Sequence, residues 1–132
     1  MLPKNFIRRH ISSWLLCVLQ FGLAVLWCFP SLAFKQTSNP AVVIAYINHL
    51  GPVWTILFGT SSLVLGYGLI SEHQAFKWSG HLGCAMVFMF YTISIVVGAS
   101  FDTPPGPYTA ALMAMVITVG HTLMAFSYGG DR

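Results

Sequence analysis

The sequence predicts an all-α membrane protein: a bundle of four transmembrane helices, with a short interfacial helix after the first span. Of its 132 residues, 56% are hydrophobic and only 7% are charged, whereas a soluble domain carries roughly 25% charged residues. Four apolar runs approach or exceed the roughly 20 residues that a helix needs to cross a bilayer. Short connections join the last three runs. These observations predict a single membrane domain covering residues 1–132.

The predicted spans cover residues 12–34, 52–70, 79–99 and 108–128, and none of them contains Asp, Glu, Lys or Arg. Residues 71–78 and 100–107 connect the last three spans. The longer connection after the first span has its own helix signals, Asn39-Pro40 at its start and Gly51-Pro52 at its end. We therefore expect an interfacial helix over about residues 40–50, too short to cross the membrane.

The basic residues predict the orientation of the chain. With the N-terminus inside, the inner segments hold five of the six basic residues and the outer segments hold only Lys35. This bias predicts that both termini are cytoplasmic. The net charge of +3 is interpreted as a topology signal, and no nucleic-acid partner is expected. A cleaved signal peptide is an alternative for the first span, because Ser31-Leu32-Ala33 resembles a cleavage site.

Each predicted span has one face of small or polar residues at helical spacing. Helices in lipid associate through such faces, because lipid tails are as apolar as leucine. Packing within one chain is one interpretation, and a water-lined pore between copies is another. The residues expected to pack helices together are Gly59, Ser62, Gly66, Gly80, Ala114 and Thr118.

Four polar side chains inside the spans are candidates for function: Gln20, His81, Tyr91 and His121. Ionisable groups in a membrane are costly and mark functional sites by default. The two histidines differ by only about 6 Å in predicted depth, at 1.5 Å per residue. They are expected to bond neighbouring helices, to respond to pH, or to ligate a haem as a pair.

The sequence contains no pattern that predicts catalysis or a metal site. No acid lies inside a span to orient a histidine, and Glu72 and Asp102 fall on opposite sides of the membrane in the predicted topology. Cys17, Cys28 and Cys84 lie in apolar runs without a CxxC spacing, which predicts buried thiols. We expect a protein that is not an enzyme and has no cofactor or metal.

The layout over residues 52–128 resembles small membrane proteins of tailed bacteriophages, especially those of actinobacteria. The likeness rests on WTILFG at the start of the second span, Gly80-His81, Tyr91, the turn from Thr103 to Tyr108, and Gly120-His121. Some such proteins are holins, which form holes by oligomerising in the host cytoplasmic membrane. The resemblance implies a bacterial cytoplasmic membrane location and a holin-like oligomer that alters permeability.

Three other functions fit the same features. The chain is also interpreted as an accessory subunit of a larger membrane complex, as a superinfection-exclusion or defence protein, or as a b-type haem protein using His81 and His121. The expected partners are the lipid bilayer and either further copies of the chain or a larger complex. The sequence does not choose among these functions.

Overall fold

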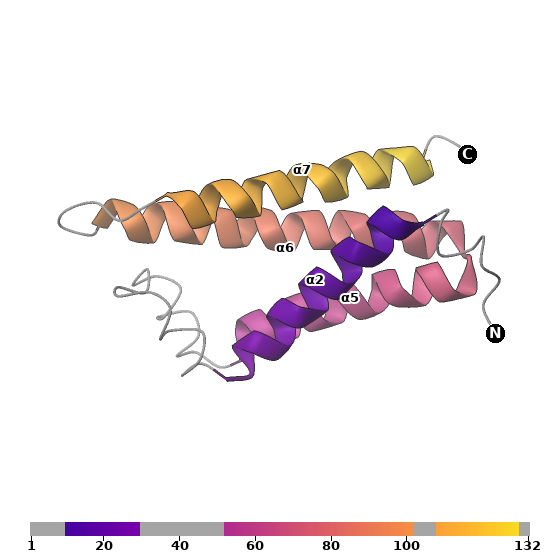
Figure 1. Cartoon of the computed structure of the whole chain (residues 1–132), viewed down its shortest axis with the longest axis horizontal. Coiled ribbons are helices and arrows are strands. Elements are labelled where there is room, and N and C mark those ends of the chain that lie inside the picture. Colours follow the sequence, from indigo (N-terminus) through magenta and orange to yellow (C-terminus); the bar gives the residue numbers. More distant parts are fainter. Residues whose placement is uncertain (1–9, 30–51, 102–107, 130–132) are drawn as a thin grey trace.

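The computed structural model describes residues 10–29, 52–101 and 108–129, and these residues form four helices (Figure 1). The predicted interfacial helix over residues 40–50 and the end of the predicted first span lie outside the described residues. The helices are α2 (Ile11–Trp27), α5 (Val53–Ser71), α6 (Gln74–Phe101) and α7 (Thr109–Gly129).

Three of these helices, α5, α6 and α7, are long and apolar enough to cross a membrane. The described part of α2 has 17 residues and is also apolar, but it is shorter than a full span. The 28 residues of α6 extend over about 42 Å at 1.5 Å per residue. This length exceeds the hydrocarbon thickness of about 30 Å, so in a bilayer α6 would tilt or extend into the headgroup region.

The helices pack in the order α2, α5, α6, α7, with α6 and α7 sharing the largest contact. A closed four-helix bundle would have a fourth contact between α2 and α7, but these two helices touch only slightly. Figure 1 shows the reason, since α2 crosses the bundle obliquely while α7 runs along α6. We call the contact between α2 and α7 the loose edge.

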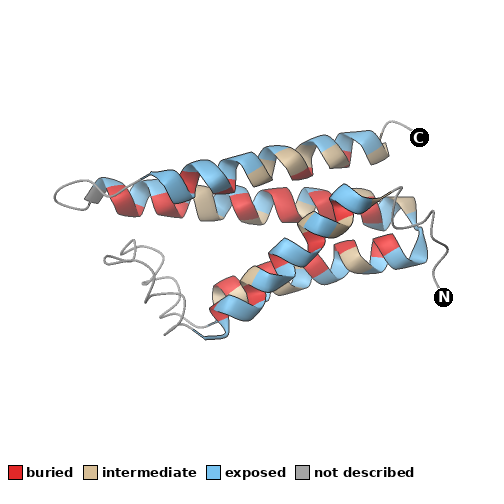
Figure 2. Cartoon of the chain, viewed as in Figure 1, coloured by how far each residue is buried: buried red, intermediate tan, exposed pale blue. Residues whose placement is uncertain are grey.

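The buried face of each helix carries many of the small and polar residues that the sequence marked out (Figure 2). On α2 this face consists of Ser13, Cys17, Gln20, Ala24 and Trp27. Among the expected packing residues, Ser62, Gly80 and Ala114 are buried and Gly59, Gly66 and Thr118 are half-buried. The outward faces carry large apolar side chains, as lipid-facing surfaces do.

The first turns of α6 differ from the predicted connection over residues 71–78. The helix begins at Gln74, and the turn after α5 contains only Glu72 and His73. Glu72 adopts the left-handed conformation, with φ of 59°, that commonly ends a helix. The first turn of α6 can contain a lysine because Lys77 Nζ lies 3.4 Å from Glu72 Oε2, at the end of the bundle where α5 ends and α6 begins.

The core divides into two regions along the bundle axis. Toward the Trp27 end, aromatic rings from three helices pack together, with Trp54 and Phe58 fully buried. The ring of Tyr91 lies 4.9 Å from that of Trp54 and 6.1 Å from that of Trp27, both edge to face. At the opposite end, where α2 begins and α7 ends, buried polar side chains lie beside a second apolar cluster that includes Leu65 and Leu69, and the candidate site lies there.

Candidate functional site: a buried histidine pair

His81 of α6 and His121 of α7 meet in the core, both with 0% of their surface exposed. Their Nδ1 atoms are 3.0 Å apart, which is a hydrogen-bond distance. The expected depth difference of about 6 Å, at 1.5 Å per residue, assumes that α6 starts at residue 79, whereas α6 begins at Gln74. Counted from Gln74 and from Gly129, both histidines lie about two turns inside their helices.

The pair continues into a hydrogen-bonded chain that reaches the end of the bundle. His81 Nε2 lies 3.0 Å from Ser13 Oγ, and Ser13 Oγ lies 3.1 Å from the hydroxyl of Tyr128. That hydroxyl lies 2.7 Å from Nδ1 of His10, the residue before α2. We call these five residues the histidine chain, and every one of them can both donate and accept a hydrogen bond.

The bond between the two imidazoles limits how many protons the pair can hold. One ring must donate its Nδ1 hydrogen and the other must accept with its Nδ1 lone pair. The accepting ring is therefore neutral, and at most one ring can be an imidazolium while the bond exists. Nε2 of His121 has no hydrogen-bond partner among the described residues.

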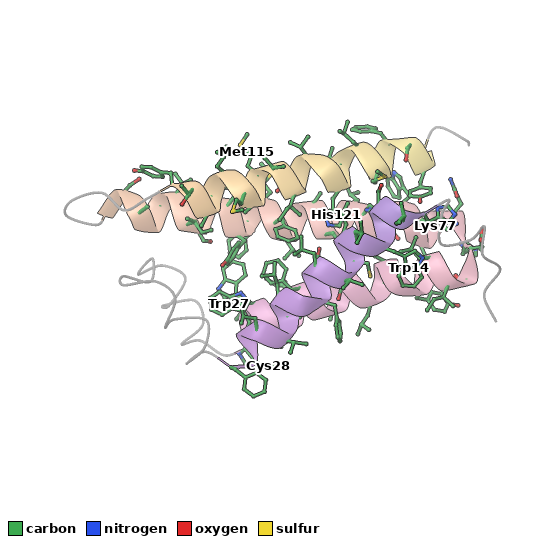
Figure 3. The ribbon with its side chains drawn as sticks, in the orientation of Figure 1. Trp14, Trp27, Cys28, Lys77, Met115 and His121 are labelled. Carbon is green, nitrogen blue, oxygen red and sulfur yellow. The ribbon has the colours of Figure 1, made fainter. Side chains whose placement is uncertain are left out.

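Polar side chains of α6 contact Tyr128 at the end of the bundle. Gln74 Nε2 donates a 2.6 Å hydrogen bond to the backbone carbonyl of Tyr128, one of the carbonyls that a helix end leaves unpaired. Lys77 Nζ lies 5.7 Å from the centre of the Tyr128 ring. Figure 3 shows Lys77 at this end of the molecule, His121 further in toward the middle, and Trp27 toward the other end.

Gln20 forms a second polar contact deeper in the bundle, between α2 and α5. Its Nε2 donates to Ser61 Oγ, and it also lies 3.5 Å from the carbonyl of Phe58. Its Oε1 is buried and has no hydrogen-bond partner in the described part of the chain. One turn away, the Cys17 thiol donates to the Ser62 carbonyl at 3.4 Å. Gln20 is thus only partly satisfied.

Tyr91, the remaining candidate, lies in the aromatic region and is not brought to the histidines. The structure instead adds Ser13, Tyr128 and His10 to the site, none of which the sequence analysis had marked as functional. A signal for Ser13 was available, because it shares a helix face with Cys17 and Gln20. The contact between His10 and Tyr128 joins the two ends of the chain and has no local sequence signal.

The histidine pair does not fit axial ligation of a haem. Metal–nitrogen bonds are about 2 Å long, so two axial nitrogens are about 4 Å apart with the macrocycle between them, and here the facing nitrogens are 3.0 Å apart. Among the described residues, no group of three His, Cys, Asp or Glu side chains could hold a metal ion. The arrangement suits hydrogen bonding and proton binding.

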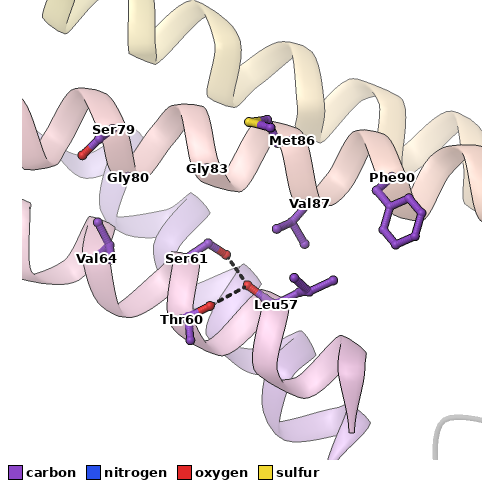
Figure 4. A pocket seen from close by; sticks show the side chains of 10 residues that line it. All are labelled: Leu57, Thr60, Ser61, Val64, Ser79, Gly80, Gly83, Met86, Val87 and Phe90. Atoms are coloured by element: carbon purple, nitrogen blue, oxygen red, sulfur yellow. Dashed lines mark hydrogen bonds between the residues drawn. The ribbon is translucent and has the colours of Figure 1, made fainter. Parts of the chain in front are cut away.

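A groove of about 410 Å³ runs along the outside of α5 and α6 (Figure 4). Gly80 and Gly83 open it on α6, and Thr60 and Ser61 form part of its α5 wall. Both hydroxyls bond carbonyls of their own helix, at 2.7 Å and 2.6 Å, so the groove offers few free polar groups. It is separate from the histidine chain.

Comparison of the protein with protein-family models, curated proteins and solved structures found no match.

Proposed function

We propose that this chain is a non-enzymatic integral membrane protein that alters membrane permeability, in the manner of phage holins, by opening at the loose edge. The observation that carries the proposal is the weak contact between α2 and α7, in a chain whose other neighbouring helices pack extensively. The hydrogen bonds of Tyr128 with Ser13 and His10 hold one end of this edge, and the rest of the edge is the easiest place for the bundle to open because α2 and α7 pack little there.

Polar groups lie behind this edge. Ser13 and Gln20 face inward from α2, and His121 faces inward from α7. Thr118 is half-buried on α7 and bonds the Ala114 carbonyl at 2.9 Å. Because unpaired polar groups are costly in lipid, an opening would have to be lined by these residues rather than by the leucine and phenylalanine faces.

Assembly of several copies would use the outer surfaces of the helices, because the small-residue faces are largely covered within one chain. Only 22% of the most apolar stretch of α7 is buried, compared with 39% for α5 and for α6. Met113 and Phe126 are among the exposed side chains of α7. We infer that α7 would contact a neighbouring copy in the host cytoplasmic membrane and that its displacement would widen the loose edge.

A cross-link across the loose edge tests the proposal. A Cβ atom at Gly120 would lie 3.9 Å from a methyl of Leu16, so Leu16→Cys and Gly120→Cys would place two thiols across the edge. These changes belong in a background without the native cysteines. Expression in a bacterium should collapse the membrane potential, reported by a potential-sensitive dye, and a short reversible thiol cross-linker should abolish the effect.

The matched control locks the neighbouring edge between α2 and α5. A Cβ atom at Gly59 would lie 3.8 Å from Cβ of Ala24, close to the separation of about 3.8 Å that a disulfide requires. Cells with Ala24→Cys and Gly59→Cys, in the same background and treated with the same cross-linker, should still lose their potential. The proposal is wrong if high expression leaves the potential intact, or if both cross-links act equally.

The exposure of α7 also fits a second function, that of an accessory subunit of a larger membrane complex. Most of the apolar stretch of α7 is left uncovered within one chain, and a different protein can cover it as well as a second copy of this chain can. Purification in mild detergent separates the two. Copies of the chain alone support the permeability function, and a defined larger complex supports the accessory function.

A further inference from the structure

We propose that the histidine pair is a proton-binding site, reached from the polar end of the bundle, that releases α7 when it takes up a second proton. This inference extends the proposed function, because α7 forms one side of the loose edge. It rests on the direct bond between His81 and His121, 3.0 Å long and fully buried.

Proton uptake and the bond between the rings exclude each other beyond one proton. The pair can gain a first proton without losing the bond between the rings. If His81 is the donor, the proton binds Nε2 of His81, which contacts Ser13; if His121 is the donor, it binds Nε2 of His121. A second proton would place a hydrogen on both Nδ1 atoms, and two positive rings would then face each other at 3.0 Å. The pair must separate for both rings to be protonated.

Among the described residues, the surroundings of the pair contain no carboxylate that would balance two positive charges. The titratable neighbours are Cys17 of α2, Lys77 and Cys84 of α6, Tyr128 of α7 and His10 before α2. On α5, the described residues near the pair carry no acid or base. Glu72, the only carboxylate among the described residues, lies in the turn after α5 and pairs with Lys77.

The histidine chain provides the route by which a proton reaches the pair. His10 and Tyr128 are half-buried at the end of the bundle, whereas Ser13, His81 and His121 are buried. Seven residues separate Tyr128 from His121 along α7, so the chain reaches about 10 Å into the bundle. Toward the other end, Phe88 stacks on His121 at 5.8 Å and begins the apolar region. The described polar contacts therefore reach the pair from this end of the bundle.

The bonds of this region fix α7 to the rest of the bundle. The side-chain hydrogen bonds that join α7 to other described residues involve His121 and Tyr128 only. Elsewhere α7 contributes small buried residues, Ala111, Ala114 and Ala125. In lipid, close packing and hydrogen bonds hold helices together, so separation of the histidines weakens the end of α7 at which its described interhelical hydrogen bonds lie.

The sign of the pH effect follows from proton counting. The open state can bind two protons at the pair and the closed state at most one, so falling pH favours the open state. One extra proton changes the opening equilibrium by up to about tenfold per pH unit. Rising pH removes that proton and returns α7 to α6.

Hydrogen exchange of the full chain in lipid discs tests this site without measuring permeability. Between about pH 8 and pH 5, amide exchange of α7 should accelerate relative to α5 in the same molecules, by up to about tenfold per pH unit. His121→Asn keeps a hydrogen-bonding side chain and should remove this pH dependence. His73→Asn, which changes an exposed histidine outside the histidine chain, should retain it.

A second measurement covers the case in which His121→Asn fails to fold. Nitrogen NMR of ¹⁵N-histidine in the unmodified protein should show both rings becoming protonated over the pH range in which α7 opens. The inference is overturned if exchange of α7 follows that of α5 at every pH, or if the rings become protonated while α7 stays closed. Opening of α7 without any membrane permeability would refute the proposed function and leave the proton site intact.

Discussion

Replacement of Gly80 by alanine should push α5 and α6 apart. A Cβ atom at Gly80 would lie 2.6 Å from Leu65 Cα and 2.9 Å from Leu65 N. These are backbone atoms that cannot rotate away, and carbon atoms pack at about 3.5–4.0 Å. The helices would have to separate by roughly 1 Å, and overpacking of this kind costs about 1–3 kcal/mol.

Gly59→Ala is the matched control for this prediction, because Gly59 is also a helical glycine facing a neighbouring helix. Its Cβ would lie 3.8 Å from Cβ of Ala24, an ordinary contact. Alanine there should be neutral or stabilising by up to about 1 kcal/mol, since glycine is the poorer helix former. The two variants should therefore differ by at least about 1 kcal/mol, roughly fivefold in the unfolding equilibrium.

Unfolding of each purified variant in mixed detergent micelles, followed by helix content against the fraction of denaturing detergent, measures this difference. Gly68→Ala should behave like Gly80→Ala, because its Cβ would lie 2.6 Å from the backbone of Phe76 and Lys77. Equal stability of Gly80→Ala and Gly59→Ala would refute the reasoning and show that the close contact between α5 and α6 is not tight in solution.

Three further predictions concern the polar core and the topology. Gln20→Leu should leave helix content unchanged and shift stability by no more than about 1 kcal/mol, because the change removes a hydrogen bond together with the unpaired Oε1. It should also reduce the permeability that the dye reports. A large loss of stability would contradict the expected balance between the lost bond and the lost unpaired atom. Reporter fusions at residues 74 and 132 should both be cytoplasmic, and an external signal at either would overturn the predicted orientation. Purified protein should show no Soret band, and a band that His81→Ala removes would restore the haem interpretation.

The helices could be predicted from the sequence because composition and length alone define apolar spans. The described α5 and α7 begin and end within one residue of the predicted limits. The predicted start of the third span, residue 79, lies five residues after the start of α6, because the pattern around Lys77 predicts a connection. Its side chain is buried through contacts with Glu72 and the ring of Tyr128, which no local pattern reports.

The candidate site was only partly predictable. His81 and His121 were recognisable because ionisable residues are rare inside apolar spans. Their direct contact depends on the relative stagger of α6 and α7. An error of two or three residues in a predicted helix start is enough to make the predicted stagger wrong. The participation of Ser13 and Tyr128 depends on how α2 crosses the bundle, a property of tertiary packing rather than of local sequence.

The glycines show the same limit of sequence reasoning. Gly59, Gly66 and Gly80 were all expected to pack helices, yet the available space differs sharply between them. A Cβ would be in ordinary contact at Gly59 and Gly66, at 3.8 Å and 3.6 Å, but not at Gly80, at 2.6 Å. Helical spacing identifies a face, whereas the distance of approach depends on the neighbouring backbone.

Distance measurement across the loose edge tests the central claim most directly. Spin labels at Leu15 of α2 and Leu123 of α7, both exposed, report the distance across that edge. Labels at Leu15 and at Leu63 of α5 report the distance across the contact between α2 and α5. In lipid discs, pulsed electron spin resonance should give a broad or two-peaked distribution for the first pair and one narrow peak for the second. Equally narrow distributions for both pairs would contradict the account.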